Sequence, residues 1–290
     1  MIIQEHPSYI YAAQAVAGEV DAPKYVVKQC KRFLEICDEE NEKYFVDLKR
    51  IKKIDAILKL IRMPKGLKIN QRIYDCVAGF QWVLIIASLC VMCVDNPEKR
   101  RYETVLLEIA RKNGKTFIIA VLFILLFFLE PRYSYFYSIA PDGSLSREIK
   151  KALEEIIGYN PEIFPQEGKD RMFKLRRDDI ECYITNSKYI PLNYSNSRLD
   201  GKLPNVFLVD EVGALPNSYA IEAMRSGQLT ILNKLGFIIS TKYPTANNPF
   251  EDEVLESSIK YVSEETVNEA ISLVQNSTIE NVEEKFNEII

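Results

Sequence analysis

Histidine is nearly absent from this 290-residue chain, in which His6 is the only one. Hydrolytic triads and zinc-hydrolase sites use histidine as a base or a ligand. The composition therefore excludes a histidine general base and a histidine-rich metal site. A strong excess of basic residues is also missing, because 37 lysines and arginines stand against 41 acids. The net charge of -4 excludes nucleic-acid binding by bulk charge alone, although it permits a local basic groove.

Long hydrophobic runs and disulfide spacing are missing as well. The apolar runs at residues 83–94 and 117–129 are shorter than the roughly 20 residues that a membrane-spanning helix needs. We expect both to form helices buried in a large core. The six cysteines show no disulfide framework, and Cys90 and Cys93 lie inside the first run without a second cysteine or histidine pair nearby. With no signal-peptide pattern at Met1, the sequence predicts a soluble protein of the reducing cytoplasm, without a membrane partner.

The charge is unevenly distributed along the chain. Residues 251–290 contain 11 acids and two lysines, so the first 250 residues carry a net charge of +5. A polyanion would therefore dock on the body of the protein and not on its tail. The tail also has the pattern of an amphipathic helix, and we interpret its acids as a solvated helical face.

The hydrophobic pattern divides the chain into three segments. Residues 1–62 are expected to form a helical N-terminal region, residues 63–250 the core, and residues 251–290 an acidic helical tail or linker. In the core, long helical patterns such as the one at 144–157 alternate with short strand patterns. Strands are expected at residues 104–109, 133–139, 180–185, 206–209 and 237–239. This alternation predicts an α/β fold with a mainly parallel central sheet flanked by helices.

A phosphate-binding loop is indicated by Glu108-Ile-Ala-Arg-Lys-Asn-Gly-Lys-Thr116, which links the first expected strand to the most apolar helix. In a P-loop, the backbone of Arg111, Lys112, Asn113 and Gly114 faces the phosphates at the start of a helix. Lys115 would neutralise the β and γ oxygens, and the Thr116 hydroxyl would hold Mg²⁺. The first glycine of the usual motif is replaced by Ile109. For this loop alone, an ordinary helix start is therefore the alternative.

Two adjacent carboxylates follow another expected strand, in Pro204-Asn-Val-Phe-Leu-Val-Asp-Glu-Val-Gly213. In a Walker B strand, Asp210 would orient Mg²⁺ and Glu211 would polarise the attacking water. Standing alone, the pair could be solvated at the edge of a sheet. Together with the P-loop it supplies the second half of a nucleotide site. The sequence therefore predicts binding of ATP and Mg²⁺ in a P-loop NTPase fold of the ASCE, RecA-like type.

A third strand, Leu235-Gly-Phe-Ile-Ile-Ser-Thr-Lys242, ends in hydroxyl residues. Ser240 and Thr241 are placed to act as a polar sensor of the γ-phosphate. The alternative is an ordinary strand end, followed by the turn at residues 243–249.

The chain resembles the large subunit of tailed-phage terminases. The loop Ala110-Arg-Lys-Asn-Gly-Lys-Thr116 is similar to the variant P-loop of that family, which usually lacks the first glycine. Further similarity lies in the segments 6–18, 30–34, 97–103 and 199–204, so the resemblance covers about residues 5 to 250. It implies an ATP-driven motor that packages viral double-stranded DNA into a procapsid. It also implies a homo-oligomeric ring, a portal protein and a small terminase subunit as partners, and the cytoplasm of a bacterial host.

The resemblance assigns further residues. Arg111 matches the P-loop arginine that stabilises the γ-phosphate, while Ser240 and Thr241 match the coupling motif. Gln81 resembles the glutamine that contacts adenine, with a helix-surface glutamine as the alternative. An arginine acting on the neighbouring subunit would be Arg147 or Arg198, and the sequence does not choose between them. DNA phosphates would meet basic clusters such as Lys49-Arg50 and Lys52-Lys53, which could equally be solvated helix faces.

One departure concerns the nuclease domain that terminase large subunits normally carry after the motor. The sequence ends at Ile290, about where that domain should begin, and we expect no nuclease activity from these residues. Two alternatives to an active motor remain: a nucleotide-binding but inactive or truncated relative that acts as a scaffold, and another P-loop DNA translocase.

Overall fold

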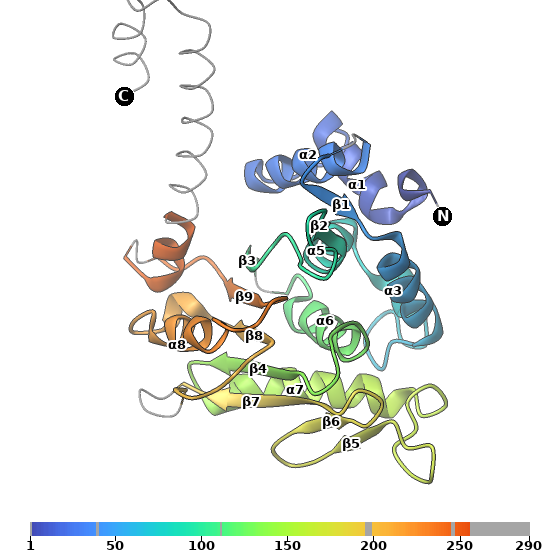
Figure 1. Ribbon diagram of the computed structural model, residues 1–290, viewed down its shortest axis with the longest axis vertical. Helices are drawn as coiled ribbons and strands as arrows, with labels where there is room; N and C mark the ends of the chain where they lie inside the picture. Colours follow the sequence, from blue (N-terminus) through green and yellow to red (C-terminus); the bar gives the residue numbers. More distant parts are fainter. Residues whose placement is uncertain (1, 39–40, 111, 195–198, 245–246, 256–290) are drawn as a thin grey trace, which may run out of the picture.

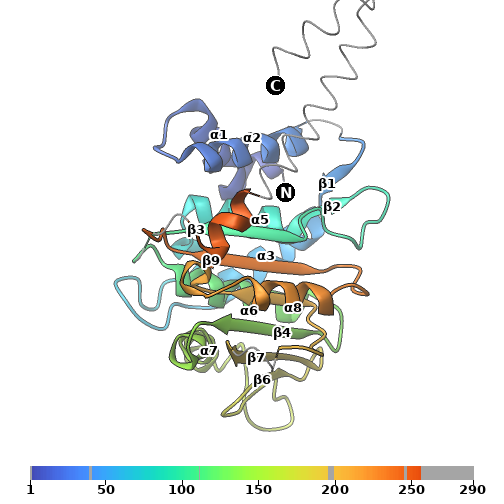
Figure 2. The same cartoon turned by 90° about the vertical axis from the view of Figure 1, so that its left-hand side faces the viewer.

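The computed structural model describes residues 2–38, 41–110, 112–194, 199–244 and 247–255. Its centre is a seven-stranded sheet in the order β3-β9-β8-β4-β7-β6-β5. Figures 1 and 2 show the strands stacked in this order. The strands are β3 (Thr104–Glu108), β9 (Leu235–Ser240), β8 (Val206–Val209), β4 (Tyr135–Ala140), β7 (Ser187–Asn193), β6 (Ile180–Cys182) and β5 (Phe173–Leu175). The pairs from β3 to β7 are parallel, which confirms the mainly parallel sheet, and the last two pairs are antiparallel.

Side chains that alternate along the strands build a separate core on each face of the sheet. In β8, Val206 and Leu208 belong to the larger core, whereas Phe207 and Val209 belong to the smaller one. Helices α6 (Lys115–Leu129) and α7 (Gly143–Tyr159) contribute to the larger core. Helix α8 (Tyr219–Gly227) covers the opposite face. The period of two along each strand thus produces the three layers that the sequence pattern predicts.

The two apolar runs behave differently. Residues 117–129 lie within α6, where Ile118 to Phe127 are all buried, as expected for a helix that is apolar on every side. In the other run, helix α5 (Gly79–Cys90) stops before the run ends, and residues 91–93 form strand β2 (Val91–Cys93). The prediction of a helix to residue 94 was therefore wrong. Strand β2 pairs antiparallel with β1 (Tyr44–Val46), a distant segment that the local pattern cannot reveal.

Strand β7 was not predicted because Pro191 and Asn193 interrupt its pattern. Strand β6 pairs only with residues 187–189 of β7. On that side of β7, Pro191 therefore has no neighbouring strand. A missing N–H is tolerated at such a position. The expected strand at 180–185 is shorter in the structure, where β6 ends at Cys182 before a turn.

The N-terminal segment is mainly helical, with α1 (Pro7–Ala17), α2 (Lys24–Asp38) and α3 (Leu48–Leu60). A short 3-10 helix (Ile3–Glu5) precedes them, and α4 (Ile73–Cys76) follows. In Figures 1 and 2, α1 and α2 lie beyond the β3 end of the sheet. Side chains of this segment and of the sheet belong to one continuous core. None of the helices in the described part of the chain combines the length and apolarity needed to cross a membrane.

The only histidine has a structural position. The His6 ring is buried, and its Nδ1 accepts a hydrogen bond from the backbone N–H of Ser8 at the start of α1. Its Nε2 lies 3.1 Å from Oδ1 of Asp55 on α3. His6 therefore caps one helix and joins it to another.

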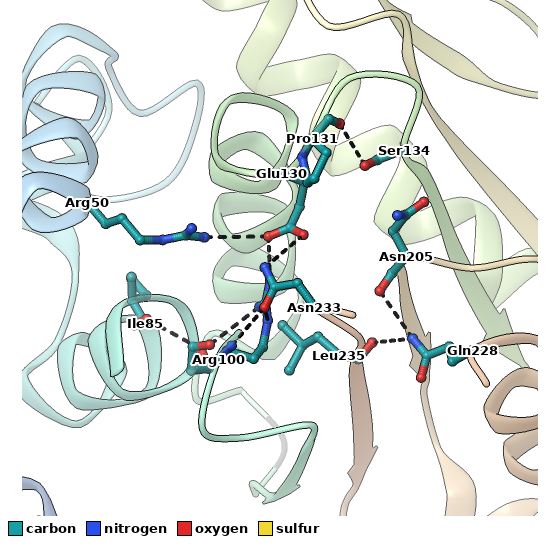
Figure 3. A network of polar contacts seen from close by, with 11 residues as sticks. Arg50, Ile85, Arg100, Glu130, Pro131, Ser134, Asn205, Gln228, Asn233 and Leu235 are labelled. Atoms are coloured by element: carbon teal, nitrogen blue, oxygen red, sulfur yellow. Dashed lines mark hydrogen bonds and ion pairs between the residues drawn. The ribbon is translucent and has the colours of Figure 1, made fainter. Parts of the chain in front are cut away.

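A buried polar network joins the C-terminal end of α6 to its surroundings (Figure 3). The Arg100 guanidinium forms an ion pair with Glu130, and its Nε donates to Oδ1 of Asn233 at 2.8 Å. Arg50 of α3 lies 3.6 Å from the same Glu130 carboxylate. Arg100 and Glu130 are 1% and 5% exposed, so Glu130 is the counter-charge of Arg100, and Arg100 is the nearer of two cations beside Glu130. The network links α3, α6 and the approaches to β3 and β9.

Substitution of Arg100 by methionine should strongly destabilise the protein. The methionine keeps an apolar stem but leaves Glu130 buried without its nearest cation, so the free energy of unfolding should fall by about 3–5 kcal/mol. The matched control is Lys99→Met, which removes a partly exposed ion pair with Glu103 (3.5 Å) and should cost under about 1 kcal/mol. Urea unfolding gives both values. Equal losses for the two variants would contradict a structural role of the network.

Candidate functional site

Three adjacent parallel strands, β3, β9 and β8, have their carboxyl ends on the same side of the sheet. In the pairing of β3 with β9, Glu108 lies opposite Ser240, and in the pairing of β8 with β9, Val209 lies opposite Ile238. The backbone N–H of Ile109 also donates to the carbonyl of Ser240 at 3.1 Å. The segments that follow these strands are therefore neighbours. They carry the loop at 109–114, the acid pair and the hydroxyl residues that the sequence singled out.

Two residues just before α6 have a left-handed backbone. Gly114 is the N-cap of α6 with φ +76°, and Lys112 also has a positive φ of +68°. Lys115 and Thr116 form the first turn of the helix, whose free N–H groups and dipole favour an anion. Ile109, in the place of the usual first glycine, is buried in the larger core. Arg111 lies outside the described residues, so its predicted role stays a prediction.

Lys115 contacts both acids of the predicted pair. Its Nζ lies 3.0 Å from Oδ1 of Asp210 and forms a close ion pair with Oε1 of Glu211. Asp210 is 6% exposed, and its backbone N–H bonds the carbonyl of Ile139 on β4. The alternative of a solvated acid pair at the sheet edge is therefore wrong for Asp210. The structure joins residues that are far apart in the sequence into one charged cluster.

The environment moves the pKa values of the two acids in opposite directions. Burial raises the pKa of Asp210 above its usual value, despite the neighbouring Lys115 charge. Burial acts in the same direction on Glu211, but hydrogen bonds and the positive charge from Lys115, with help from Thr241 and Tyr243, lower the pKa of this residue overall. Burial also opposes the charge of Lys115, yet the two carboxylates raise its pKa. Glu211 and Lys115 are accordingly held as a charged pair.

Glu211 has an unusual backbone. Its φ of +51° lies in the left-handed region, which costs a non-glycine residue of order 1 kcal/mol or more. Its N–H donates to Oδ1 of Asp210 at 2.8 Å, and a short 3-10 helix (Val212–Ala214) follows. The turn points the Glu211 side chain back toward Lys115. Strain of this kind is found where the surrounding structure fixes a functional side chain.

The hydroxyl residues after β9 contact this turn. Thr241 Oγ1 donates to Oε2 of Glu211 at 3.2 Å, and so does the Tyr243 hydroxyl at 3.3 Å. Ser240 Oγ accepts from the backbone N–H of Gly213 at 3.1 Å and donates to the carbonyl of Thr241 at 2.8 Å. Sequence reasoning assigned Tyr243 to a turn only. No signal in the local pattern identifies its hydroxyl as a partner of Glu211.

Gln81 is buried beside Gly114, at the start of α6. It is 4% exposed, so the alternative of a helix-surface glutamine is wrong. Its Oε1 accepts from the backbone N–H of Ala78 at 3.0 Å, at the start of α5. Its Nε2 lies 3.1 Å from the position that a Cβ on Gly114 would occupy. Gln81 thus packs against the loop, and contact with a base remains a prediction.

The remaining predicted residues are less closely connected. Arg147 is exposed on α7, while Arg198 lies outside the described residues. In the basic clusters of α3, Lys49 and Lys52 are exposed, but Arg50 approaches Glu130 and Lys53 Nζ donates to the Phe128 carbonyl. The acidic tail is described only to residue 255, so its predicted helical face lies largely outside the described residues.

The cysteines are free thiols, and four of the six belong to the larger core or pack against it. Burial raises the pKa of Cys30 to about 11 and holds the pKa of Cys90 still higher. A neutral thiol is a poor metal ligand. Within the described ranges, no group of three or more histidine, cysteine, aspartate or glutamate side chains could hold a metal ion by itself. Both findings agree with the interpretation of Cys90 and Cys93 as buried free thiols.

The backbone of Gly114 gives a direct test of the loop. Gly114→Ala should lower the free energy of unfolding by about 1–2 kcal/mol, because alanine is strained at a positive φ and its Cβ would crowd Gln81. Gly158→Ala is the matched control, since this glycine lies inside α7 with open space around it and should gain about 0.5–1 kcal/mol. Thermal or urea unfolding measures both changes. A stabilising effect at Gly114 would show that the loop has a different backbone.

Comparison with known proteins gives one family and several solved structures. Over residues 85–260 the sequence matches the family described as terminase large subunit, ATPase domain. No curated protein matches the chain in sequence. The fold is similar to the large terminase of bacteriophage HK97, with a TM-score of 0.56 and 20% identity over 71% of this chain and 41% of the other. The chain thus spans less than half the length of that protein.

Two further structures show weaker similarity. The large terminase ATPase domain of a Thermus phage has a TM-score of 0.40 and 21% identity, over 49% of this chain and 60% of the other. A large terminase from a thermophilic bacteriophage, solved in complex with ADP, has a TM-score of 0.38 and 15% identity, over 48% and 33%.

The family match covers more than half of the chain, and the HK97 similarity confirms the fold that the sequence predicted. The matched residues include the loop at 109–114, the acid pair and the hydroxyl residues of the candidate site. The chain belongs to the ATPase-domain family of terminase large subunits.

Proposed function

We propose that these residues form an ATP-hydrolysing motor that drives double-stranded viral DNA into a procapsid, in the cytoplasm of the infected host. The contact of Lys115 with both Asp210 and Glu211 supports this most directly, because it joins a phosphate-loop lysine to two carboxylates at one edge of a parallel sheet. P-loop ATPases need this set of charges for phosphoryl transfer to water. Family membership supports the packaging role.

The charges of the site fit ATP with Mg²⁺. Asp210 and Thr116 supply a carboxylate and a hydroxyl oxygen, which are the ligand types that Mg²⁺ prefers. When bound, Mg²⁺ would be held by Asp210 and Thr116 and would neutralise part of the negative charge of the phosphates. The backbone of Lys112, Asn113 and Gly114 and the start of α6 would bind the phosphates. Gln81 would lie beside the loop, where the resemblance places the base.

In the proposed mechanism, Lys115 exchanges partners. Its Nζ is paired with two carboxylates, and the phosphates of ATP would offer a denser negative charge to the same Nζ. Once Lys115 has turned to the phosphates, Glu211 is free to orient and polarise the attacking water. Arg111 would offset charge on the γ-phosphate, and Ser240 and Thr241 would transmit its loss.

The partners follow from the family. A homo-oligomeric ring around DNA would use an arginine from the neighbouring subunit, for which Arg198 and the exposed Arg147 are candidates. A portal protein and a small terminase subunit complete the proposed assembly. No nuclease function is proposed for these residues.

ATP hydrolysis tests the site. We expect Mg²⁺-dependent turnover that rises with double-stranded DNA, and a loss of at least about 100-fold in Lys115→Ala and Glu211→Gln, because each removes a charge from phosphoryl transfer. Lys151→Ala and Glu222→Gln, both exposed on helices, are matched controls that should keep full activity. Tight nucleotide binding without turnover under any condition would favour the scaffold alternative. Absence of nucleotide binding would contradict the site itself.

Double-stranded DNA should bind mainly through its phosphates. We expect similar affinity for unrelated sequences and a linear fall of log K with log salt concentration. Lys49→Ala together with Lys52→Ala should reduce that slope by about 2, if both exposed lysines of α3 meet phosphates. Fluorescence anisotropy at several salt concentrations measures the slope. The double variant Lys28→Ala, Lys31→Ala on α2 removes the same charge and serves as the control. If it reduces the salt slope equally, α3 is not a specific DNA surface.

A further inference from the structure

Tyr243 lies three residues beyond β9 and reaches the acid turn after β8. Its hydroxyl donates to Oε2 of Glu211 at 3.3 Å. Thr241 Oγ1 donates to the same oxygen at 3.2 Å. Lys115 contacts the other oxygen, Oε1. The two carboxylate oxygens of Glu211 are therefore held by different partners, one by the lysine and one by two hydroxyls.

The Tyr243 ring is fixed by the turn that carries Glu211. A Cβ on Gly213 would lie 2.5 Å from Cδ2 of Tyr243 and 3.0 Å from its Cγ. Only a residue without a side chain permits this approach of the ring to the backbone. The Gly213 N–H also bonds Ser240 Oγ, so the segments after β8 and β9 are interlocked. The ring of Tyr243 therefore packs directly against the backbone of this turn.

Glu211 needs such support. Its left-handed backbone, with φ +51°, is strained, and its side chain is drawn toward Lys115 by the ion pair. A carboxylate held by the lysine alone would follow it or rotate when the lysine moves. The hydroxyls of Thr241 and Tyr243 hold Oε2 independently of Lys115.

We propose that Tyr243 is a positioning residue that fixes the Glu211 carboxylate for water activation, an inference that rests on the proposed ATPase function. When Lys115 turns to the phosphates, Tyr243 and Thr241 keep Oε2 in place, and Oε1 becomes free to accept a hydrogen bond from the attacking water. Tyr243 donates one hydrogen bond and transfers no proton in this role. It would act through Glu211, with which its hydroxyl forms the hydrogen bond.

Tyr243→Phe separates positioning from nucleotide binding. It removes the hydroxyl and keeps the ring that packs against Gly213. We expect kcat to fall about tenfold, as for the loss of one hydrogen bond to a charged group, while the Kd for ATP changes less than twofold. The matched control is Tyr219→Phe, which removes a hydroxyl that donates to the Asp200 carboxylate at 2.9 Å, a contact that lies outside the acid cluster. Its kcat should equal that of the unmodified protein.

A double-mutant cycle on stability tests the contact without relying on turnover. The Tm shifts of Tyr243→Phe and Glu211→Gln should be non-additive in the double variant, because the two groups share one hydrogen bond. Additive shifts would overturn the contact. Non-additive shifts with an unchanged kcat in Tyr243→Phe would overturn the positioning role and make the contact purely structural.

The proposed function and this inference fail in different ways. If the unmodified protein does not hydrolyse ATP, the proposed function fails and the inference about Tyr243 fails with it. If Glu211→Gln hydrolyses ATP as fast as the unmodified protein, the ATPase function stands, but Glu211 does not act on water and the role of Tyr243 is overturned. If Glu211→Gln is inactive but Tyr243→Phe keeps its full kcat, the ATPase site stands and the role of Tyr243 falls. A fall in kcat together with a large rise in the Kd for ATP would also overturn positioning, because it would show contact with nucleotide or a collapsed site.

Discussion

The parallel pairing of β3, β9 and β8 is the constraint on which the candidate site depends. Its register sets Glu108 opposite Ser240, so β3 and β9 end at the same level, and it sets Val209 opposite Ile238, so β8 ends two residues before β9. Everything that follows these strands then meets at one edge, including Lys115, the acid pair and the hydroxyls. A slip of one residue would turn every side chain of a strand to the other face and exchange the two cores. The burial of both faces therefore also fixes the geometry of the site.

Helix α6 runs from the site, at the carboxyl ends of the strands, to the polar network near their amino ends. Lys115 opens the helix beside the carboxylates, and Glu130 follows its end in the network with Arg100 and Asn233. Between these charged ends the helix is buried on nearly all sides, against α3, α7 and the sheet. The lysine is thus held by a rigid element that is fixed at both ends. This arrangement favours movement of the Lys115 side chain over movement of its backbone.

The local pattern predicted a substantial part of the structure because neighbouring residues decide it. Strand β8 has the predicted bounds, since four apolar residues between Asn205 and Asp210 leave little choice. Helix α6 was predicted from its apolar run. The contact of Lys115 with Asp210 and Glu211 follows from two motifs, one at the start of a helix and one directly after a strand. Strand β2 was missed because it depends on pairing with β1, and β7 because Pro191 hides its pattern. Arg111 and Arg198 lie outside the described residues and remain predictions.

The sequence by itself determined which chemical groups this protein has: a lysine at a helix start, a carboxylate pair after a buried strand, hydroxyls after another, and no histidine base. These groups belong to short segments, and the types and spacing of neighbouring residues are enough to identify them. Only the tertiary structure decided which groups touch. Gln81 lies against Gly114, and Tyr243 reaches Glu211 across Gly213, because the register of the sheet and the packing of α5 bring distant segments together. Such contacts depend on how the chain crosses between strands. The number of residues between two segments does not tell whether they become neighbours in the fold.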